Sequence, residues 1–411
     1  MKADEYVDEG YAMLSTPDIK GRDIDFAGAN RITKARYDES PEIKLRAGDT
    51  LLAKDGSTLG TVNLVRDLKR PSTVNSSLAV ISPGGRLVDA FLLYYFQAAF
   101  IVARIEEQKG GMGVPHLFQD DLVRFPLPLP PLREQKRIAA FLDRETAKID
   151  ALVGEQQRLI ELLKEKRQAI ISRAVSKGLD PSAPMKNSGV EWLGKVPAHW
   201  EVVKFGRAID YQEGPGIMAD DFRDEGVPLM RVAGVGGRWA TLQGCNFLDP
   251  EKVAKRWDHF RLTPGELVIS ASASMGTVSE VGPDAEGAIP YTGLIRLRPK
   301  DQLTERGYIR ALVSSRLFFV QIDLLKTGAT IQHFGPVHLA RMFVTCPPLA
   351  EQRAIAAYVE EREEQFAALI GAAESGIELL IERRAALISA AVTGKLDVGS
   401  QSAASAELEL A

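Results

Sequence analysis

The sequence predicts an α+β protein in which two globular domains are joined by two long antiparallel coiled-coil helices with pseudo-two-fold symmetry. The main observation is an internal repeat, because residues 130–180 and 347–397 are related by a constant shift of 217 positions and share 24 of 51 residues. A repeat with so long a period indicates two large copies of one architecture, not a solenoid. Segments rich in short strand patterns precede both copies and predict the globular domains.

Each copy of the repeat predicts one long helix. Both begin at a proline pair, Pro130-Pro131 and Pro347-Pro348, and then lack proline over the rest of the repeat. Apolar residues follow at three- and four-residue steps or their multiples, as in a coiled coil. They are Leu142, Ile149, Leu152, Leu159, Leu163 and Ile170 in the first copy, and Val359, Phe366, Leu369, Leu380 and Leu387 in the second. A helix of this length is about 65 Å long, so its apolar face requires a second helix.

The net charges of the two predicted helices are opposite, which favours packing of the two helices against each other. Residues 130–175 contain ten Lys/Arg and seven Asp/Glu, a net charge of +3, whereas residues 347–392 contain four Lys/Arg and eight Asp/Glu, a net charge of −4. Complementary flanking charges select partners in coiled coils. The alternative is that each helix packs on its own domain.

The order of segments along the chain gives the domain boundaries. We expect domain 1 at residues 1–129, a first helical spacer at 130–176, a linker at 177–189, domain 2 at 190–346, a second helical spacer at 347–393, and a disordered tail at 394–411. The linker is dense in Pro, Gly and Ser and predicts an extended surface segment. The tail is rich in Ser, Ala and Glu.

The two domains correspond to each other weakly. Strand patterns occur at 50–53 and 78–81 in domain 1 and at 267–270 and 294–297 in domain 2, and helical patterns follow at 88–106 and 308–325. Asp8-Glu-Gly in domain 1 already matches Asp224-Glu-Gly in domain 2, so about thirty residues expected at the front of domain 1 are absent. Either translation starts upstream, or domain 1 lacks its first strands.

Composition limits the possible classes of protein. The 411 residues carry a net charge of −4, which excludes a free, nonspecific nucleic-acid coat protein. The sequence contains no run of eighteen apolar residues and has a polar N-terminus, so we expect a cytoplasmic protein with no membrane association. The two cysteines, Cys245 and Cys346, form no metal-binding spacing, and we expect both to be buried apolar residues.

The motifs at the ends of the repeats resemble those of the specificity (S) subunits of type I restriction-modification enzymes. Leu129-Pro-Pro-Leu-Arg-Glu-Gln and Cys346-Pro-Pro-Leu-Ala-Glu-Gln precede the helices, and residues 172–180 and 389–397 end them with Ser-Arg-Ala-Val-Ser-Lys-Gly-Leu-Asp and Ser-Ala-Ala-Val-Thr-Gly-Lys-Leu-Asp. Residues 188–200 open domain 2 with Ser-Gly-Val-Glu-Trp-Leu-Gly-Lys-Val-Pro-Ala-His-Trp. The resemblance covers the whole chain.

This resemblance implies a DNA-binding subunit without a catalytic centre. In such a family each target-recognition domain reads one half of a bipartite, asymmetric site in double-stranded DNA, and the paired helices fix the spacing between the halves. Two methylation (M) subunits and two restriction (R) subunits are the implied partners. S-adenosylmethionine, ATP and Mg would be bound by those partners, with adenine-N6 methylation and ATP-dependent cleavage as activities of the complex, and no cofactor or metal by this chain.

The motifs expected of a DNA methyltransferase or an ATPase are missing from the sequence, as the lack of a catalytic centre implies. The sequence contains no Asn/Asp-Pro-Pro-Tyr/Phe motif, no P-loop, and no glycine-rich loop placed between a strand and a helix. Pro17-Asp18 with Glu42-Ile-Lys44 could form the acidic-acidic-lysine pattern of a nuclease, but such short fragments match by chance, and domain 2 contains nothing comparable.

Candidate DNA contacts are the residue types that bind base edges and phosphates, placed in polar, glycine-bounded loops. They are Lys54, Ser57, Thr58, Arg66, Lys69, Arg70, Asn75, Lys109 and His116 in domain 1, and Arg231, Arg238, Ser272, Ser274, Lys326, Thr330, Gln332 and His333 in domain 2. His116 and His333 recur at one equivalent place, which favours a shared backbone contact or loop-fixing hydrogen bond.

Candidate scaffold and partner-interface residues come from the repeated Pro-Pro-Leu-x-Glu-Gln motif and from the apolar faces of the two helices. They are Leu132, Glu134, Gln135, Leu142, Ile149, Leu152 and Leu163 in the first helix, and Leu349, Glu351, Gln352, Val359, Phe366, Leu369 and Leu380 in the second. Two other hypotheses stay open. The chain could be a coiled-coil adaptor whose domains bind proteins, or a truncated, silent specificity subunit.

Overall fold

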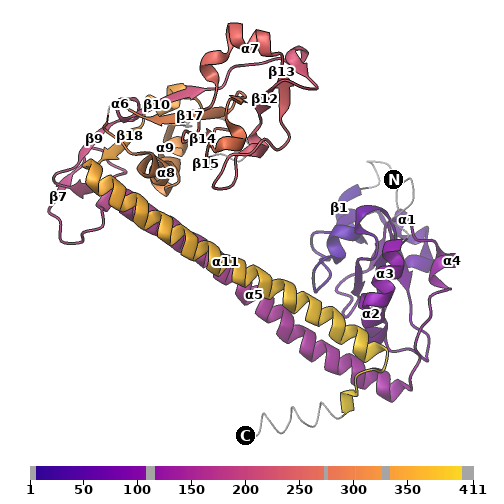
Figure 1. Ribbon diagram of the computed structural model, residues 1–411. Helices are drawn as coiled ribbons and strands as arrows, with labels where there is room; N and C mark the ends of the chain where they lie inside the picture. Colours follow the sequence, from indigo (N-terminus) through magenta and orange to yellow (C-terminus); the bar gives the residue numbers. More distant parts are fainter. Residues whose placement is uncertain (1–5, 108–115, 273–275, 301, 326–333, 400–411) are drawn as a thin grey trace. The chain divides into compact units, whose positions relative to one another are not determined.

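The computed structural model describes residues 6–107, 116–272, 276–300, 302–325 and 334–399, drawn as ribbons in Figure 1. Its contacts divide the chain into two compact units, which are described separately below. Unit 1 comprises Met1–Arg158 and Ala373–Ala411, and unit 2 comprises Leu159–Ala372. Each unit therefore contains one globular domain together with half of each long helix.

The two long helices are α5 (Leu132–Lys177) and α11 (Leu349–Val392). In unit 1, Leu142 of α5 and Ile388 of α11 belong to one buried cluster, and in unit 2 Val175 of α5 and Ile355 of α11 belong to another. The start of each helix thus lies beside the end of the other, as Figure 1 shows. The predicted α+β class with two long antiparallel helices is confirmed. In the described chain, no helix combines the length and apolar character needed to cross a membrane.

Domain 1 in unit 1 has two small sheets and four helices, and its buried apolar residues form two clusters. Its sheets have the orders β2-β1-β5 and β4-β3-β6, and α2 packs behind the second. The elements are β1 (Tyr6–Leu14), β2 (Asn30–Ile32), α1 (Lys34–Asp38), β3 (Thr50–Ala53), β4 (Val62–Leu64), β5 (Ser72–Val74), β6 (Leu78–Ile81), α2 (Asp89–Gln97), α3 (Ala99–Glu107) and α4 (Gln119–Leu122).

Domain 2 in unit 2 repeats this plan with additional strands. Its larger sheets have the orders β10-β17-β14-β15 and β11-β13-β12-β16, and two-stranded pairs β18-β9 and β7-β8 complete it. The elements are β7 (Met185–Asn187), β8 (Lys195–Pro197), β9 (Glu201–Lys204), α6 (Phe205–Ala208), β10 (Ile209–Glu213), β11 (Phe222–Arg223), β12 (Val227–Met230), β13 (Asn246–Leu248), α7 (Pro250–Arg256), β14 (Leu267–Ser270), β15 (Val278–Glu280), β16 (Ile289–Pro290), β17 (Leu294–Pro299), α8 (Arg306–Val313), α9 (Arg316–Leu325), α10 (Pro336–Leu339) and β18 (Phe343–Cys346).

Strand register demonstrates that the domains are copies. Ala12 of β1 pairs with Ser72 of β5 in parallel, and Leu229 of β12 pairs in parallel with Ile289 of β16, at the same shift of 217 positions. Domain 2 also contains β9, α6 and β10, which have no counterpart among the described residues of domain 1. Most of the remaining elements of the two domains correspond in order along the chain.

Some expected elements differ in detail. The four predicted strands occur as β3, β6, β14 and part of β17, but each predicted domain helix is divided in two, as α2 and α3 and as α8 and α9. Part of the linker pairs as β7 with β8. Leu396 and Val398 pack on the core of unit 1, so the tail expected to be disordered from residue 394 is ordered there, and residues 400–411 lie outside the described residues. Both cysteines are half-buried, not buried.

Candidate nucleic-acid interface

The buried glutamine of the Pro-Pro-Leu-x-Glu-Gln motif fixes the start of each long helix to its domain. In unit 1, the Gln135 side chain accepts a hydrogen bond from the Val88 amide (2.8 Å) and donates to the carbonyls of Arg86 (3.0 Å) and Pro130 (2.8 Å). Both Gln135 and its copy Gln352 are fully buried. A buried side-chain amide with every hydrogen bond made holds its partners in one geometry.

Gln352 makes the same three contacts in unit 2. It accepts from the Glu305 amide (2.8 Å) and donates to the carbonyls of Leu303 (2.7 Å) and Pro347 (2.8 Å). Each partner lies 217 positions after its counterpart in unit 1. Gln135 and Gln352, predicted as scaffold residues, therefore connect the helices to the domains and do not lie at the surface.

A serine near the end of each helix binds the other domain. Ser389 of α11 accepts a hydrogen bond from the Ala99 amide at the first residue of α3 (2.8 Å), and Ser172 of α5 accepts one from the Arg316 amide at the first residue of α9 (3.0 Å). A side-chain oxygen at a helix N-terminus satisfies a free amide there. Each domain is thus held by the start of one long helix and the end of the other.

The seam between the helices differs in part from the predicted apolar face. Leu142, Ile149, Val359 and Phe366 are buried as expected, and Leu163 and Leu380 are half-buried. Leu152 and its copy Leu369, however, are 46% and 54% exposed. An α-helix has 3.6 residues per turn, whereas the predicted spacing repeats every 3.5 residues. Successive positions of the predicted apolar face therefore rotate around the helix, and these two leucines lie beside the contact between the helices. Leu132 is exposed and Leu349 is half-buried.

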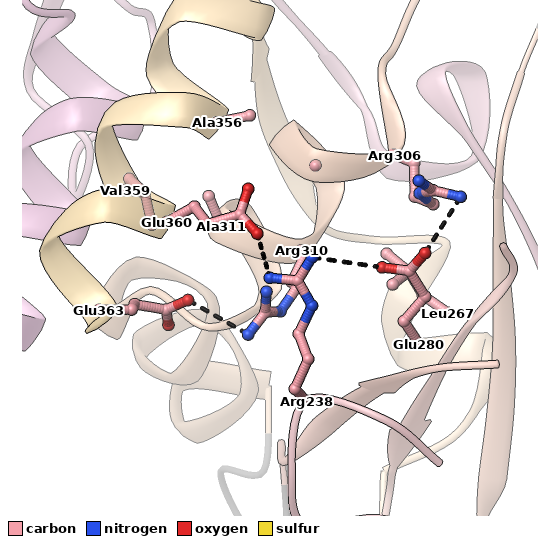
Figure 2. A pocket seen from close by; sticks show the side chains of 11 residues that line it. Arg238, Leu267, Glu280, Arg306, Arg310, Ala311, Ala356, Val359, Glu360 and Glu363 are labelled. Carbon is pink, nitrogen blue, oxygen red and sulfur yellow. Dashed lines mark hydrogen bonds and ion pairs between the residues drawn. The ribbon is translucent and has the colours of Figure 1, made fainter. Parts of the chain in front are cut away.

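Acidic residues of α11 in unit 2 pair with domain 2, not with α5. Figure 2 shows Glu360 bound to Arg238, and Glu363 bound to Arg310 of α8 (3.2 Å). Glu280 joins the same network, because it pairs with Arg306 (3.1 Å) and lies 3.9 Å from Arg238. The predicted charge complementarity therefore acts mainly between helix and domain. In unit 1, Arg384 of α11 pairs with Asp150 of α5 (3.0 Å), with signs opposite to those expected from net charge.

The motif glutamate has different surroundings in the two units. Glu351 accepts a hydrogen bond from the Trp200 indole (2.8 Å) and bonds to the His199 ring (2.5 Å), and the Trp200 side chain is fully buried. In the described part of unit 1, no residue bonds to Glu134 in this way. Both glutamates were predicted as scaffold residues, and the structure places the Glu351 carboxylate between α11 and the segment that leads to β9.

Several predicted DNA contacts of domain 1 gather where β3 ends. The Lys54 amide donates to the Ser77 carbonyl (2.9 Å) and the Lys54 carbonyl accepts from the Leu117 amide (2.9 Å). His116 is hydrogen-bonded to Asp55, so its ring fixes this loop. Ser57, Thr58 and Asn75 belong to the same group of loops, and Ser57 is exposed. We call this group of six residues, Lys54, Asp55, Ser57, Thr58, Asn75 and His116, the β3 loop cluster.

The remaining basic candidates of domain 1 lie at the other end of β3. Arg66, Lys69 and Arg70 follow β4, which is antiparallel to β3, so their loop is close to the first residue of β3. Arg66 lines a 670 Å³ cavity together with Lys20 and Arg22, two cations that the sequence did not single out. The predicted contacts of domain 1 thus form two groups, and Lys109 lies outside the described residues.

In domain 2 the structure locates three of the eight candidates. Arg238 belongs to the ion-pair network with α11, which indicates a structural task for this side chain. Arg231 packs over the Tyr291 ring, 4.0 Å from its centroid, and is half-buried. Ser272 follows β14 at the position that Asp55 has in domain 1, and its carbonyl accepts from Ser270 (3.0 Å). Ser274, Lys326, Thr330, Gln332 and His333 lie outside the described residues.

Sequence reasoning missed the serines that bind the domain helices. Ser172 and Ser389 stand in the motifs that end the repeats, but nothing in a single sequence says where a hydroxyl near a helix C-terminus points. The signal that could have found them is that serine occurs at both positions, 217 residues apart.

The chain is similar to the specificity subunits of type I restriction enzymes. Residues 4–162 match the family model of the type I restriction modification DNA specificity domain. Over 364 residues the chain is 25% identical to the MjaVIII type I restriction enzyme specificity subunit of Methanocaldococcus jannaschii, covering 87% of this chain and 81% of that protein. It is 22% identical over 321 residues to the EcoBI type I restriction enzyme specificity subunit of Escherichia coli, covering 76% and 66%.

Solved structures share the fold, among them one from work on complex assembly and conformational transition of the type I R-M system. That structure aligns with a TM-score of 0.67 and 22% identity over 86% of this chain and 83% of that chain. The likeness supports the arrangement of two domains and two long helices.

Proposed function

Because this chain belongs to the family of type I restriction-modification specificity subunits, we propose that it provides the DNA specificity of such a complex and has no catalytic centre of its own. Domain 1 reads one half of a bipartite, asymmetric site in double-stranded DNA, and domain 2 reads the other half. Different half-sites require domains with the same fold and different loops, and the alignment of Asp55 with Ser272 is one such difference.

The observation that carries this proposal is the repeated attachment of each domain to both helices. Gln135 and Ser389 hold domain 1, and Gln352 and Ser172 hold domain 2, through hydrogen bonds at matched positions. A spacer of defined length favours those DNA sites in which both half-sites can be bound at once. The same helices then set the number of unread base pairs between the halves.

Within domain 1, we assign base contacts to the β3 loop cluster and phosphate contacts to Arg66, Lys69 and Arg70. The cluster offers Lys, Ser, Thr and Asn side chains, which bind base edges in the major groove. The hydrogen bond between His116 and Asp55 pre-orders this loop. Arg and Lys on a separate loop suit backbone phosphates, which position the protein without reading sequence.

The partners follow from the function. Two methylation subunits and two restriction subunits assemble on this chain, and they bind S-adenosylmethionine, ATP and Mg. Adenine-N6 methylation and ATP-dependent cleavage are activities of that complex.

Selection from random double-stranded DNA by the complex with its methylation subunits tests the proposal. We expect enrichment of one motif with two conserved blocks and a fixed unread gap. Exchanging domain 2 for that of a relative should change one block and leave the other block and the gap unchanged. A coiled-coil adaptor would enrich no sequence, and this alternative is not favoured by the relatives, which are all named as specificity subunits.

A further inference from the structure

Four cationic side chains line one cavity of 670 Å³ in unit 1. Lys20 and Arg22 reach it from the segment after β1, Arg66 from the segment after β4, and Arg384 from α11. Two carboxylates of α5 line the same cavity. Because the positive charges outnumber the negative ones, the cavity attracts an anion.

Both carboxylates of this cavity already have partners. Arg384 pairs with Asp150 (3.0 Å) and donates to the Gln97 side chain (3.4 Å). Asp143 accepts a hydrogen bond from the Tyr94 hydroxyl (2.7 Å). The other three cations of the cavity form no ion pair with any residue that the structure describes. Their charge is therefore available to a ligand.

A buried amide fixes the loop that carries Lys20 and Arg22. Asn63 of β4 is 3% exposed, and its side chain donates to the two carbonyls on either side of Lys20, at 3.1 and 2.8 Å. Arg66 donates to the Arg22 carbonyl (3.3 Å), which joins the two cation-bearing segments. These bonds use only the main chain of the loop, so the Lys20 and Arg22 side chains stay exposed at a fixed place.

The copy of this cavity in unit 2 has neutralised most of its charge. Its 500 Å³ are lined at matching positions, 217 residues apart, by Gly237, Ser314 and Arg167 in place of Lys20, Gln97 and Arg384. At the position of Asn63 it has Glu280, a carboxylate that lies 3.9 Å from Arg238. Arg238 also pairs with Glu360, and Arg310 pairs with Glu363, as Figure 2 shows.

The two units thus use one place in the fold differently. In unit 2 a glutamate binds the arginine side chain itself, and among the described cations of that cavity only Arg167 has no ion pair. In unit 1 a neutral asparagine binds the main chain of the loop and leaves the Lys20 and Arg22 side chains without a carboxylate. The comparison points to unit 1 as the unit whose cavity takes an anionic ligand.

The lining of the cavity suits a phosphate group. Apart from Val62, Leu93 and the Tyr94 ring, the described residues that line it are polar or glycine. Such a wall offers little surface to a base or to another apolar group. Arg and Lys donors on separate segments instead match the several oxygens of one phosphate, and contacts of this kind position a protein on DNA.

Building on the proposed function, we propose that this cavity binds one backbone phosphate of the DNA beside the half-site that domain 1 reads. Lys20, Arg22 and Arg66 contact the phosphate oxygens. Arg384 is a positioning residue, because its pairing with Asp150 removes a repelling charge from the cavity. The helix α11 then takes part in DNA binding through this ion pair.

Duplexes that carry a single neutral methylphosphonate test the proposal, with the chain in complex with its methylation subunits. For the unchanged complex we expect one backbone position, next to the block read by domain 1, at which the neutral group weakens binding about ten-fold. Lys20→Ala with Arg22→Ala should weaken binding to cognate and random duplexes by the same factor and reduce the slope of log K against log salt by about 1. This double variant should no longer respond to the methylphosphonate at that position.

Two controls separate the cavity from the general charge of the protein. Arg86→Ala with Arg124→Ala removes the same charge from exposed arginines of unit 1 that do not line the cavity, and this variant should still respond to the methylphosphonate. Lys20→Arg with Arg22→Lys keeps both charges and should respond as well. Because the Lys20 and Arg22 side chains bond to no described residue, all these variants should keep the Tm of the unchanged chain.

Arg384 has its own test. Arg384→Ala leaves the Asp150 carboxylate unpaired beside the phosphate and should weaken binding to all duplexes. Adding Asp150→Ala removes that carboxylate and should restore most of the affinity. A side chain that only supports the fold would show no such recovery.

Three results would overturn this inference. One is that neutral groups at every backbone position affect the unchanged complex and the Lys20→Ala, Arg22→Ala variant equally. Another is that the arginine control loses the response as well, since the effect would then come from overall charge. The third is saturable binding of inorganic phosphate to the complex without DNA while no methylphosphonate has an effect, because a free anion would then be the ligand. Each would leave a selected bipartite motif in place, whereas the absence of any motif would contradict the proposed function itself.

Discussion

The hydroxyl of Ser172, close to the end of α5, accepts a hydrogen bond from the Arg316 amide that begins α9, at 3.0 Å. Its copy Ser389 does the same for Ala99 and α3, at 2.8 Å. Each contact joins a long helix to the domain that precedes the other long helix in sequence. Deleting or shifting one helix would therefore disturb both domains.

We predict that Ser389→Ala and Ser172→Ala each lower the free energy of unfolding by about 1 kcal/mol, because each leaves the first amide of a domain helix without its cap. Hydrogen exchange should become faster in α3 for the first variant and in α9 for the second. Thr393→Ala, which removes a hydroxyl that donates to the Ser389 carbonyl from just beyond the end of α11, is the control and should have a smaller effect. If a single variant made hydrogen exchange faster in α3 and α9 to the same extent, the serine would not act as a cap of one helix alone.

Replacing the buried motif glutamine should be more damaging. Gln135→Leu leaves the Val88 amide and the Arg86 and Pro130 carbonyls unpaired in the interior, and Gln352→Leu does the same in unit 2. We expect a loss of about 3 kcal/mol for either variant in chemical unfolding. Gln157→Leu on an exposed turn of α5 is the control. A loss below 1 kcal/mol for both buried variants would mean that the motif acts on a partner.

Arg238 distinguishes a structural role from a DNA-binding one. If it fastens its loop to α11, Arg238→Ala and Glu360→Ala should be non-additive, with a coupling of about 0.5 kcal/mol for a pair this exposed. Chemical unfolding of the two single variants and the double variant without DNA measures that coupling. Additive effects, together with loss of DNA affinity only in Arg238→Ala, would assign the side chain to DNA.

Lys69 is an exposed cation with no described partner, and we assign it to a phosphate. Lys69→Ala should weaken binding to all DNA sequences alike and reduce the slope of log K against log salt by about 1. Titrations of cognate and random duplexes at several salt concentrations measure both quantities. A change in the selected motif would contradict this assignment.

Alkaline pH should destabilise unit 1 through Tyr95. Burial raises the pKa of the Tyr95 phenol to about 12, whereas in the unfolded chain its pKa is near 10.0. Between these values the unfolded chain has lost a proton that the folded chain keeps, so stability falls as pH rises. Tyr95→Phe should make unfolding less dependent on pH between 10 and 12. An unchanged pH dependence would contradict the burial of this hydroxyl.

Much of the fold could be predicted because it depends on periodicity. The proline pairs placed the starts of α5 and α11 within two residues, and strands such as β3 and β14 were predicted at their observed bounds. The break between α2 and α3 was not predicted, because Ala98 has no helix-breaking chemistry and the Ala99 amide is capped by Ser389 from far along the chain. The exposed Leu152 and Leu369 were misplaced because sequence spacing alone does not fix the seam.

The candidate site was less predictable. Residue chemistry identified Arg238 as a DNA contact, yet its carboxylate partner Glu360 is 122 positions away, and such long-range pairs have no local signal. The loop bond between His116 and Asp55 followed from a repeated histidine, which only the duplication made visible.

Methylation-sensitive sequencing of the host genome with and without this gene measures DNA specificity in the cell. If the chain provides the specificity of a methylating complex, deletion removes N6-methyladenine from one bipartite, asymmetric motif with a fixed gap, and restoring the gene restores it. In a host that expresses the methylation subunits, a methylome that is the same with and without the gene would show that the chain does not have this function.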